Sequence, residues 1–535
     1  VCTIITACGS TRKDYSHLFN KKSNYDVSGA EVSPFLGRWK LLSVENPNDW
    51  IMVSIGERHD SLMVSLAYIL NYGRFLEPGN IDGNGKTIPD ICILTPKSGN
   101  TVKGVYCPEC SRLKYAPFSS FSIRLIDENT MVMITGKGRC NFTNLKNWNE
   151  FSEHIHPKPG FLKSAFYNLT SEKMIDFLTE QGMESVVERG DRAFPASHLA
   201  SDVVDALLRA AEGAGAEVLC GKEVDKVSRT GQAGVDDFQV NCTDGSCYVC
   251  SKLIICTGGL SYPKTGSTGD GYGWAKDMGH SLRPLFPSLT AIVPSGYKDI
   301  TISGKGSEVG KGHIDRSTPL SETGNMLCGN QLKNVGLSII IDGNTAAEEF
   351  GDLDFTDGGL EGPIGFKVSR KCVNALMNGS RVQAIIDMKP AVEIEDLQAR
   401  IAALWNEIAK DKRSANKLYK DRFKILLTKV LPMQLIPGFV KMNPNADHKS
   451  LAKALKGWKM DMEGYVGYER CVVTAGGVSQ DEMTPKTLES RLVPGLYFAG
   501  EILDLDGDTG GYNLQIAFST GYLAGSSAAR TLTSK

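Results

Sequence analysis

A short strand that runs into an acidic, glycine-rich loop and then into a helix constrains this chain more than any other feature. Residues 496–498 are apolar, residues 504–511 form the acidic loop, and a helical pattern begins at Asn513. Backbone N–H groups and the helix dipole of such a junction point into one pocket, which favours an anion or a cofactor. We therefore predict α/β structure with a ligand site here. An ordinary turn between a strand and a helix is the alternative.

The overall charge limits the classes of partner. The chain has 535 residues, enough for several domains, and its 59 Lys and Arg residues nearly balance 61 Asp and Glu residues. The net charge of −2 gives no protein-wide basic field, so we expect no nucleic-acid partner and no binding to an anionic membrane surface. No apolar run is long enough to span a bilayer. The 14 cysteines are not a disulfide framework in a chain of this length.

Three short patterns imitate functional motifs. Cys107 and Cys110 form one CxxC pair, and Cys247 and Cys250 form another. The span between the pairs is far longer than zinc sites use, so we expect two surface thiol pairs and no metal. Residues 79–87 approach a phosphate-binding loop, but the spacing of the glycines is wrong and we reject that interpretation.

The first quarter of the chain has strand-like patterns and little helix. We expect a tail over residues 1–30, in which the Ile-Thr-Ala-Cys run ending at Cys8 resembles a lipoprotein lipid-attachment site. Residues 31–134 predict a small, mostly-β segment that ends in a hairpin over residues 121–134. Gly-Arg-Trp at residues 37–39 resembles the lipocalin signature, so this part resembles lipocalin-like lipoproteins of gut bacteria.

Two further glycine-rich loops follow apolar strands. Residues 135–144 (TGKGRCNFTN) combine glycines with a cation, a thiol and two amides. Residues 257–272 (TGGLSYPKTGSTGDGY) follow the buried run at residues 253–256 and lead into a helix. A continuous apolar strand followed by a helix is typical of a parallel sheet.

Together the three loops resemble a bacterial family of NAD(P)/FAD-dependent oxidoreductases that includes aminoacetone oxidase and a bile-acid dehydro-reductase. The runs ERGDRAFPASHLASDVVDALL, PLFPSLTAIV, FTDGGLEGPIGF and VTAGGVSQDEMTPKTLESRLVPGLYFAGE fit the same family in the same order. The resemblance covers about residues 131–535. It implies an α/β fold with a discontinuous FAD-binding domain of the two-dinucleotide type, into which β-barrel-like and helical domains are inserted, preceded by the small mostly-β segment.

The resemblance also implies domain boundaries and cofactor contacts. The FAD-binding domain would occupy residues 135–293, the inserted β domain 294–390, the helical subdomain 391–455, and the end of the β domain with the second FAD-binding part 456–535. The residues that would contact FAD lie on the three loops and on one further strand. They are Gly136, Gly138, Arg139, Cys140, Asn141, Val224, Thr257, Gly258, Gly259, Gly500, Glu501, Gly510, Gly511, Asn513 and Leu514.

The chain departs from the family pattern in two places. It contains no GxGxxG turn, which normally grips the pyrophosphate; the nearest candidate, at residues 90–100, has Thr-Pro-Lys in place of glycines. Asp127 could be the carboxylate that binds the ribose of FAD, if residues 123–127 form the second strand of the FAD-binding fold. The same residues fit the predicted hairpin better. We therefore expect the first βαβ unit to be missing. Asp357 and Glu361 occupy positions where the family implies His and Ser. If these positions contact the substrate, the site would prefer a substrate of different charge.

These features predict an FAD-dependent oxidoreductase that transfers a hydride between flavin and a small organic substrate in the cytoplasm. NAD(P)H or oxygen would be the second partner. Cys140, Tyr262 and Tyr512 are possible acids or bases, but packing roles fit them better, so no catalytic residue is assigned. The alternative is a lipid-anchored, lipocalin-like ligand-binding protein with a flavoprotein remnant. A third interpretation is a junction of two genes near residue 131.

Overall fold

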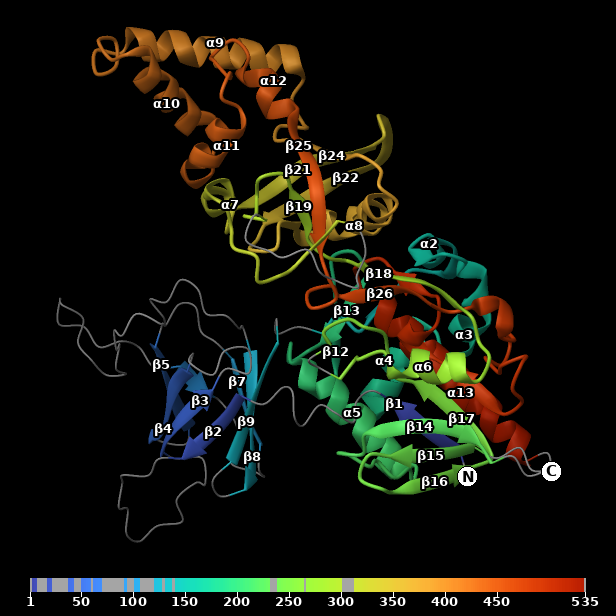
Figure 1. Ribbon diagram of the computed structural model, residues 1–535. Helices are drawn as coiled ribbons and strands as arrows, with labels where there is room; N and C mark the ends of the chain where they lie inside the picture. Colours follow the sequence, from blue (N-terminus) through green and yellow to red (C-terminus); the bar gives the residue numbers. More distant parts are fainter. Residues whose placement is uncertain are drawn as a thin grey trace.

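The computed structural model describes residues 140–230, 238–263, 266–300 and 312–532 with their side chains, and strands β1 to β9 before them by their backbone (Figure 1). No helix in these parts of the chain is long and apolar enough to cross a membrane. The predicted contacts Gly138 and Arg139, the thiols of Cys107 and Cys110, and the candidate lipidation site Cys8 lie outside the described residues.

A small parallel sheet carries the predicted ligand junction. It contains β1 (Cys2–Thr6), β17 (Lys252–Cys256) and β27 (Leu496–Phe498), in the order β1-β17-β27. The central residues of β17 and all of β27 are buried, which explains their continuous apolar sequence. Helices α6 (Asp270–Asp277) and α13 (Tyr512–Thr533) follow β17 and β27 along the chain, as the strand–loop–helix pattern predicted.

Strand β1 differs from the expected tail over residues 1–30. Each of its five residues pairs with β17 in parallel, from Cys2 opposite Lys252 to Thr6 opposite Cys256. The stretch expected as a tail therefore contains strand β1 and also β2 (His17–Lys21). A short apolar run has no local signal that separates a tail from an edge strand. Among the described strands, β1 has β17 as its one neighbour in this sheet.

An antiparallel meander lies beside the parallel sheet. It consists of β14 (Val224–Arg229), β15 (Phe238–Cys242) and β16 (Cys247–Cys250). Cys247 is exposed and Cys250 is buried, so the prediction of a surface thiol pair was wrong here. Residues three positions apart on a strand point to opposite faces, which separates these two thiols.

Short helices and strands surround the first and third loops. Strand β10 (Thr143–Asn144) pairs with β13 (Arg192–Pro195), which pairs with β12 (Ser185–Glu188). Strand β11 (Ile155–His156) pairs with β28 (Asp506–Gly507), which ties the first loop region to the acidic loop. The helices of this layer are α2 (Trp148–Ser152), α3 (Lys163–Asn168), α4 (Ser171–Glu180) and α5 (Ala200–Gly213).

The inserted β domain is a closed barrel. Strand β19 (Ile292–Pro294) pairs with β23 (Leu360–Glu361) on one side and with β25 (Trp458–Val466) on the other, which closes the sheet. The remaining barrel strands are β21 (Gln331–Ile341), β22 (Asn344–Phe355) and β24 (Val382–Asp387), while β20 (His313–Ile314) adds to β25. Helices α7 (Glu322–Leu327) and α8 (Gly362–Met377) pack nearby. Strands β18 (Leu282–Ser288) and β26 (Val473–Val478) connect the barrel to the parallel sheet.

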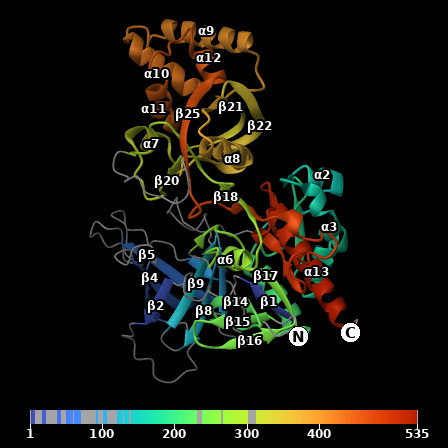
Figure 2. The ribbon, with the colours of Figure 1, turned by 45° about the vertical axis from the view of Figure 1, so that its right-hand side comes forward.

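A helical subdomain lies at the end of the barrel remote from the parallel sheet in both views (Figures 1 and 2). Its helices are α9 (Ile394–Lys410), α10 (Tyr419–Val430), α11 (Ile436–Met442) and α12 (Leu451–Lys456). Leu397, Ile401 and Ile408 are the buried residues of α9 and recur at helical spacing.

The N-terminal part forms one antiparallel sheet. Its strands are β2 (His17–Lys21), β3 (Gly37–Leu42), β4 (Trp50–Arg58), β5 (Ser61–Ile69), β6 (Ile91–Ile93), β7 (Thr101–Val105), β8 (Ser120–Asp127) and β9 (Thr130–Gly136). Their order is β6-β5-β4-β3-β2-β9-β8-β7. Strands β8 and β9 form the predicted hairpin, and Asp127 pairs with Thr130 at its turn, as the hairpin interpretation required.

Candidate functional site

The second and third loops meet because β17 and β27 are parallel neighbours. Both strands end at the same edge of the sheet, so Thr257 begins one loop there and Ala499 begins the other. Ligands of open α/β sheets bind at this edge, outside the carboxyl ends of the strands.

Glu501 joins these two loops. Its Oε1 accepts a hydrogen bond from the Ser261 hydroxyl (2.8 Å) and another from the Thr474 backbone N–H (2.8 Å). A Cβ atom added to Gly259 would lie 2.6 Å from the same Oε1 and 2.4 Å from Thr474 Oγ1, so only glycine fits against this carboxylate. Burial raises the pKa of Glu501.

Thr474 was missed by the sequence analysis. It lies in β26, and its Oγ1 also accepts a hydrogen bond from the Leu260 N–H (2.8 Å). It belongs to the VTAGGVS run that carried part of the family resemblance. That run was the one available signal for its position at the loop junction.

The first loop packs against the N-terminus of α13. A Cβ atom on Gly511, whose φ is +97°, would lie 2.5 Å from the Thr143 carbonyl group and 2.7 Å from Asn141 Oδ1. The Thr143 hydroxyl donates to Gln515 Oε1 (2.6 Å), and the Asn144 amide donates to the Gly510 carbonyl (3.0 Å). Two of the predicted loops are therefore in direct contact, and glycine is required at the contact.

Two buried oxygen atoms in the loops have no hydrogen-bond partner among the described residues. They are Asn141 Oδ1 in the first loop and Thr257 Oγ1 in the second. A buried polar atom without a partner costs about 1–3 kcal/mol, so such atoms are rare unless a ligand satisfies them. The two oxygens fit a ligand that carries N–H or O–H groups, as FAD does.

The acidic loop is held by the inserted barrel. Asp506 is fully buried, and both of its oxygens accept from Arg370 on α8, with the Nε atom at 2.8 Å and an Nη atom at 3.2 Å. Burial raises the pKa of Asp506, and Arg370 opposes this shift. The ion pair therefore connects the barrel helix to the loop that precedes α13.

A second carboxylate of this loop binds two histidines that sequence reasoning missed. His154 Nδ1 lies 2.9 Å from Asp508 Oδ2, and His156 Nε2 lies 3.1 Å from Asp508 Oδ1. Burial alone would raise the pKa of Asp508, but the hydrogen bonds from the histidines outweigh it and lower the pKa to about 2. The ring of His154 also stacks on Tyr512, with the ring centres 4.5 Å apart.

Asn513 uses its side chain within the acidic loop. Its Oδ1 accepts from the Gly507 N–H (2.7 Å), and its Nδ2 donates to the Gly507 carbonyl (2.7 Å) and to the Asp508 carbonyl (3.3 Å). The neighbouring Leu514 is 39% exposed. The Asn513 side chain therefore holds the acidic loop in place through hydrogen bonds to its backbone. The sequence analysis predicted only a cofactor contact for this residue.

The other predicted contacts are spread more widely. Gly136 ends β9, Val224 begins β14 in the meander, and Cys140 is half-buried with its pKa raised to about 11 by burial. Gly258 has a φ of +75°, and the Gly500 N–H donates to the Thr520 hydroxyl (2.9 Å).

The two positions that depart from the family pattern form an ion cluster with Arg470. The Arg470 guanidinium donates to both oxygens of Glu361, and its Nη1 lies 2.6 Å from Asp357 Oδ1. Burial alone would raise the pKa of Asp357, but Arg470 outweighs it and lowers the pKa. Glu361 and Arg470 also act electrostatically on the hydroxyl of Tyr262, the residue that follows Ser261 of the second loop. The cluster therefore adjoins the loop junction.

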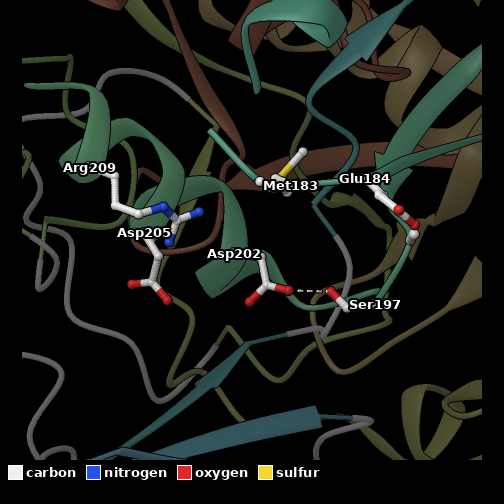
Figure 3. Close-up of a pocket in the computed structure, with 8 residues that line it drawn as sticks. Met183, Glu184, Ser197, Asp202, Asp205 and Arg209 are labelled. Atoms are coloured by element: carbon white, nitrogen blue, oxygen red, sulfur yellow. Dashed lines mark hydrogen bonds between the residues drawn. The ribbon is translucent and has the colours of Figure 1, made fainter. Parts of the chain in front are cut away.

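A separate cavity of about 460 Å³ lies between α5 and the segments 182–184 and 196–197 (Figure 3). The Ser197 hydroxyl donates to Asp202 (2.5 Å) at its wall, and the Arg209 guanidinium donates to the Gln181 carbonyl. None of the predicted cofactor contacts lines this cavity, so we assign the candidate site to the loops.

The chain is similar in sequence to several known proteins. A family model described as the HI0933-like protein Rossmann domain matches residues 118–527. The 3-dehydro-bile acid delta(4,6)-reductase of Clostridium scindens is 26% identical over 409 residues, which cover 74% of this chain and 89% of that protein. The ribosomal RNA dihydrouridine synthase of Haemophilus influenzae is 29% identical over 411 residues, covering 75% and 89%.

A protein of the same name from Escherichia coli is 29% identical over 393 residues, covering 73% of this chain and 87% of that protein. The solved structure of the Diels-Alderase PyrE3 aligns over 71% of this chain and 61% of that chain with 10% identity, but its TM-score of 0.23 is too low to support an argument. The match over residues 118–527 shows that this chain belongs to the HI0933-like family, the flavin-dependent oxidoreductase family that the three loops predicted.

Proposed function

We propose that this chain binds FAD at the junction of the three loops and transfers a hydride between the flavin and a small organic substrate. NAD(P)H would supply the electrons if the substrate is reduced, and oxygen would accept them if the substrate is oxidised. The observation that carries the proposal is the pair of unpartnered buried oxygens, Asn141 Oδ1 and Thr257 Oγ1, beside the glycine contacts of the loops. When bound, FAD supplies the hydride donor and acceptor of the reaction.

The residues of the junction bind and orient the cofactor. Asn141 and Thr257 offer hydrogen-bond acceptors. Gly259 and Gly511 let the loops that carry these residues pack closely together. Glu501 offers a carboxylate that Ser261 and the Thr474 N–H hold in place. The N-terminus of α13 favours negative charge in its vicinity.

The relatives favour a carbon–carbon double bond as the group that is reduced. Two of them are named as a delta(4,6)-reductase and a dihydrouridine synthase. Both names describe saturation of a double bond, and in both substrates that bond is conjugated to a carbonyl group. We propose the same class for this chain, an alkene polarised by a carbonyl. Substrate selection by charge would depend on the ion cluster of Asp357, Glu361 and Arg470.

Reconstitution and single-turnover reduction test this function. The purified full chain is incubated with FAD, desalted, reduced under anaerobic conditions with NADH or NADPH, and mixed with cyclohexenone as a neutral enone. The account predicts visible flavin absorbance, bleaching by a nicotinamide donor, and recovery of the absorbance with the enone. Gly259→Val should abolish flavin uptake, because its side chain would overlap Thr474 and Glu501. Gly525→Ala, at an open helix position, is the matched control. A colourless wild-type protein would refute the proposal.

The N-terminal sheet favours a second candidate function. Strands β2 to β9 form one antiparallel sheet, and β3 begins at the Gly-Arg-Trp run at residues 37–39. We therefore retain a lipid-anchored, lipocalin-like ligand-binding protein as the alternative. Fatty-acid labelling of Cys8 in cells that carry the full-length gene tests it, with Cys8→Ser as the control. An unlabelled protein in the soluble fraction would refute this candidate.

A further inference from the structure

The near-zero net charge of the chain conceals a strong separation of charge. Residues 394–456, which contain helices α9 to α12, carry 13 Lys and Arg residues against six Asp and Glu residues. The rest of the chain carries 46 basic residues against 55 acidic ones. The expectation of no nucleic-acid partner was drawn from the whole chain, and such an average says nothing about the field of one subdomain.

The positive charge is concentrated where α9 connects to α10. Residues 410–424, which we call the basic tip, contain seven basic and two acidic residues. Six of the basic side chains are exposed, and none of them forms an ion pair within the described parts of the chain. These six are Lys410, Lys412, Arg413, Lys417, Lys420 and Lys424. The subdomain's paired lysines are instead Lys429, Lys441 and Lys456.

Aromatic rings stand beside these cations. Tyr419 is 44% exposed, its hydroxyl lies 3.0 Å from His448 Nδ1, and its ring is nearly parallel to Phe423. Trp405 stacks on His448 at 4.5 Å, and the Arg422 guanidinium lies 5.3 Å from the Trp405 ring centre. The contacts fix the Tyr419 ring while leaving part of it accessible, so it is preorganised for stacking.

The start of α10 adds backbone donors to the same place. Its N-cap residue, Leu418, makes no side-chain capping hydrogen bond and is 76% exposed. The first N–H groups of a helix favour anions, although they would not define a site alone. Here they reinforce the lysines around them.

We infer that the basic tip is a docking surface for RNA, which the helical subdomain holds away from the flavin loops. Exposed cations match the phosphates, and a fixed, accessible aromatic ring matches an unstacked base. Cations alone would suit an acidic protein equally well, so the accessible Tyr419 ring favours a nucleic acid over an acidic protein. The inference extends the proposed reductase to a substrate presented on RNA. Docking itself does not require flavin.

Charge reversal at the tip provides the test. Binding of a fluorescein-labelled, single-stranded RNA of mixed sequence to the full chain is measured by anisotropy at several salt concentrations. Lys412→Glu/Arg413→Glu/Lys417→Glu should weaken binding by about 100-fold and lower the salt slope by about 2–3. Tyr419→Ala should weaken it by about tenfold with little change in the slope.

A control variant carries the same change of net charge elsewhere. Lys276→Glu/Lys333→Glu/Lys486→Glu alters three exposed lysines outside the helical subdomain and should bind RNA within about twofold of wild type. An equal loss in this control, or no RNA binding by the wild type, would overturn the inference. Displacement of RNA by an equal charge of poly-L-glutamate would also overturn it, in favour of an acidic protein partner.

Flavin content separates this inference from the proposed function. The tip variant should keep the wild-type FAD content and rate with cyclohexenone, because the tip lies remote from the parallel sheet (Figure 1). Colourless protein that still binds RNA through the tip would refute the reductase and leave the docking surface standing. Flavin-loaded protein that does not bind RNA would refute the docking surface and leave the reductase standing.

Discussion

The two ends of the proposed FAD site are built in different ways. At the end near α13, contacts between distant segments hold the loops of the proposed site together, as between Gly511 and Thr143 or between Glu501 and Thr474. At the other end, the dinucleotide fold normally relies on one local motif, the GxGxxG turn after the first strand. Strand β1 pairs with β17 as a first strand would, but the chain contains no GxGxxG motif. A pocket assembled from dispersed contacts can therefore persist where a local motif is missing.

The largest expected effect comes from breaking the support of the α13 end. Arg370→Met leaves the buried Asp506 carboxylate unpaired, which should lower the free energy of unfolding by about 3–5 kcal/mol. Urea denaturation measures this value, and flavin should be lost in parallel. Adding Asp506→Asn to the variant should restore part of the stability. An Arg370→Met protein as stable as wild type would show that the barrel does not hold the loop.

Gly511→Ala should disturb the contact between the first and third loops. Its Cβ would lie 2.5 Å from the Thr143 backbone at a positive φ, so we expect a loss of about 2–4 kcal/mol in the free energy of unfolding and weaker flavin binding. Chemical denaturation and flavin titration measure the two effects. Gly525→Ala, which meets nothing within 4 Å in α13, should be neutral or stabilise by up to about 1 kcal/mol. Equal behaviour of the two variants would contradict the close contact.

Acid stability should depend on Asp508. Its folded-state pKa of about 2 lies below the ordinary value of 3.8, so its contribution is present above pH 3.8 and is lost as the pH falls toward 2. Allowing for partial exposure, this contribution is about 1–2 kcal/mol. Asp508→Asn should lower the free energy of unfolding at pH 6 and have little effect near pH 2. Parallel stability curves for the two proteins between these pH values would refute the assignment.

The smallest expected effect concerns the dinucleotide end. If the α13 end supplies most of the affinity, FMN should bind within about tenfold of FAD, a difference of about 1.4 kcal/mol or less. Isothermal titration of the apoprotein with each flavin measures the ratio. A preference for FAD of a thousandfold would instead require a strong pyrophosphate and adenine site, and would remove the contrast between the two ends.

Local patterns were predictable from the sequence, and contacts between distant segments were not. The apolar run of β27 and the helical spacing after Asn513 each depend on neighbouring residues, so both elements were anticipated. The Arg370–Asp506 ion pair joins residues 136 positions apart and leaves no periodic signal. The same reason explains why Thr474 was missed.

Net charge and residue spacing do not show where side chains lie in the folded protein. The net charge of −2 is correct, but it combines a basic helical subdomain with an acidic remainder. The cysteine spacing at residues 247 and 250 suggested a pair, whereas the alternation of a strand places one thiol inside and one outside. Both points depend on which surface each residue occupies.

The flavin content of the full chain shows whether the three loops bind FAD. The purified protein is incubated with excess FAD, desalted, denatured, and assayed for released FAD by fluorescence and chromatography, with Gly259→Val as the matched negative control. The account predicts stoichiometric FAD in the wild type and none in the variant. Wild-type protein that retains no FAD, or a variant that retains as much as wild type, would contradict it.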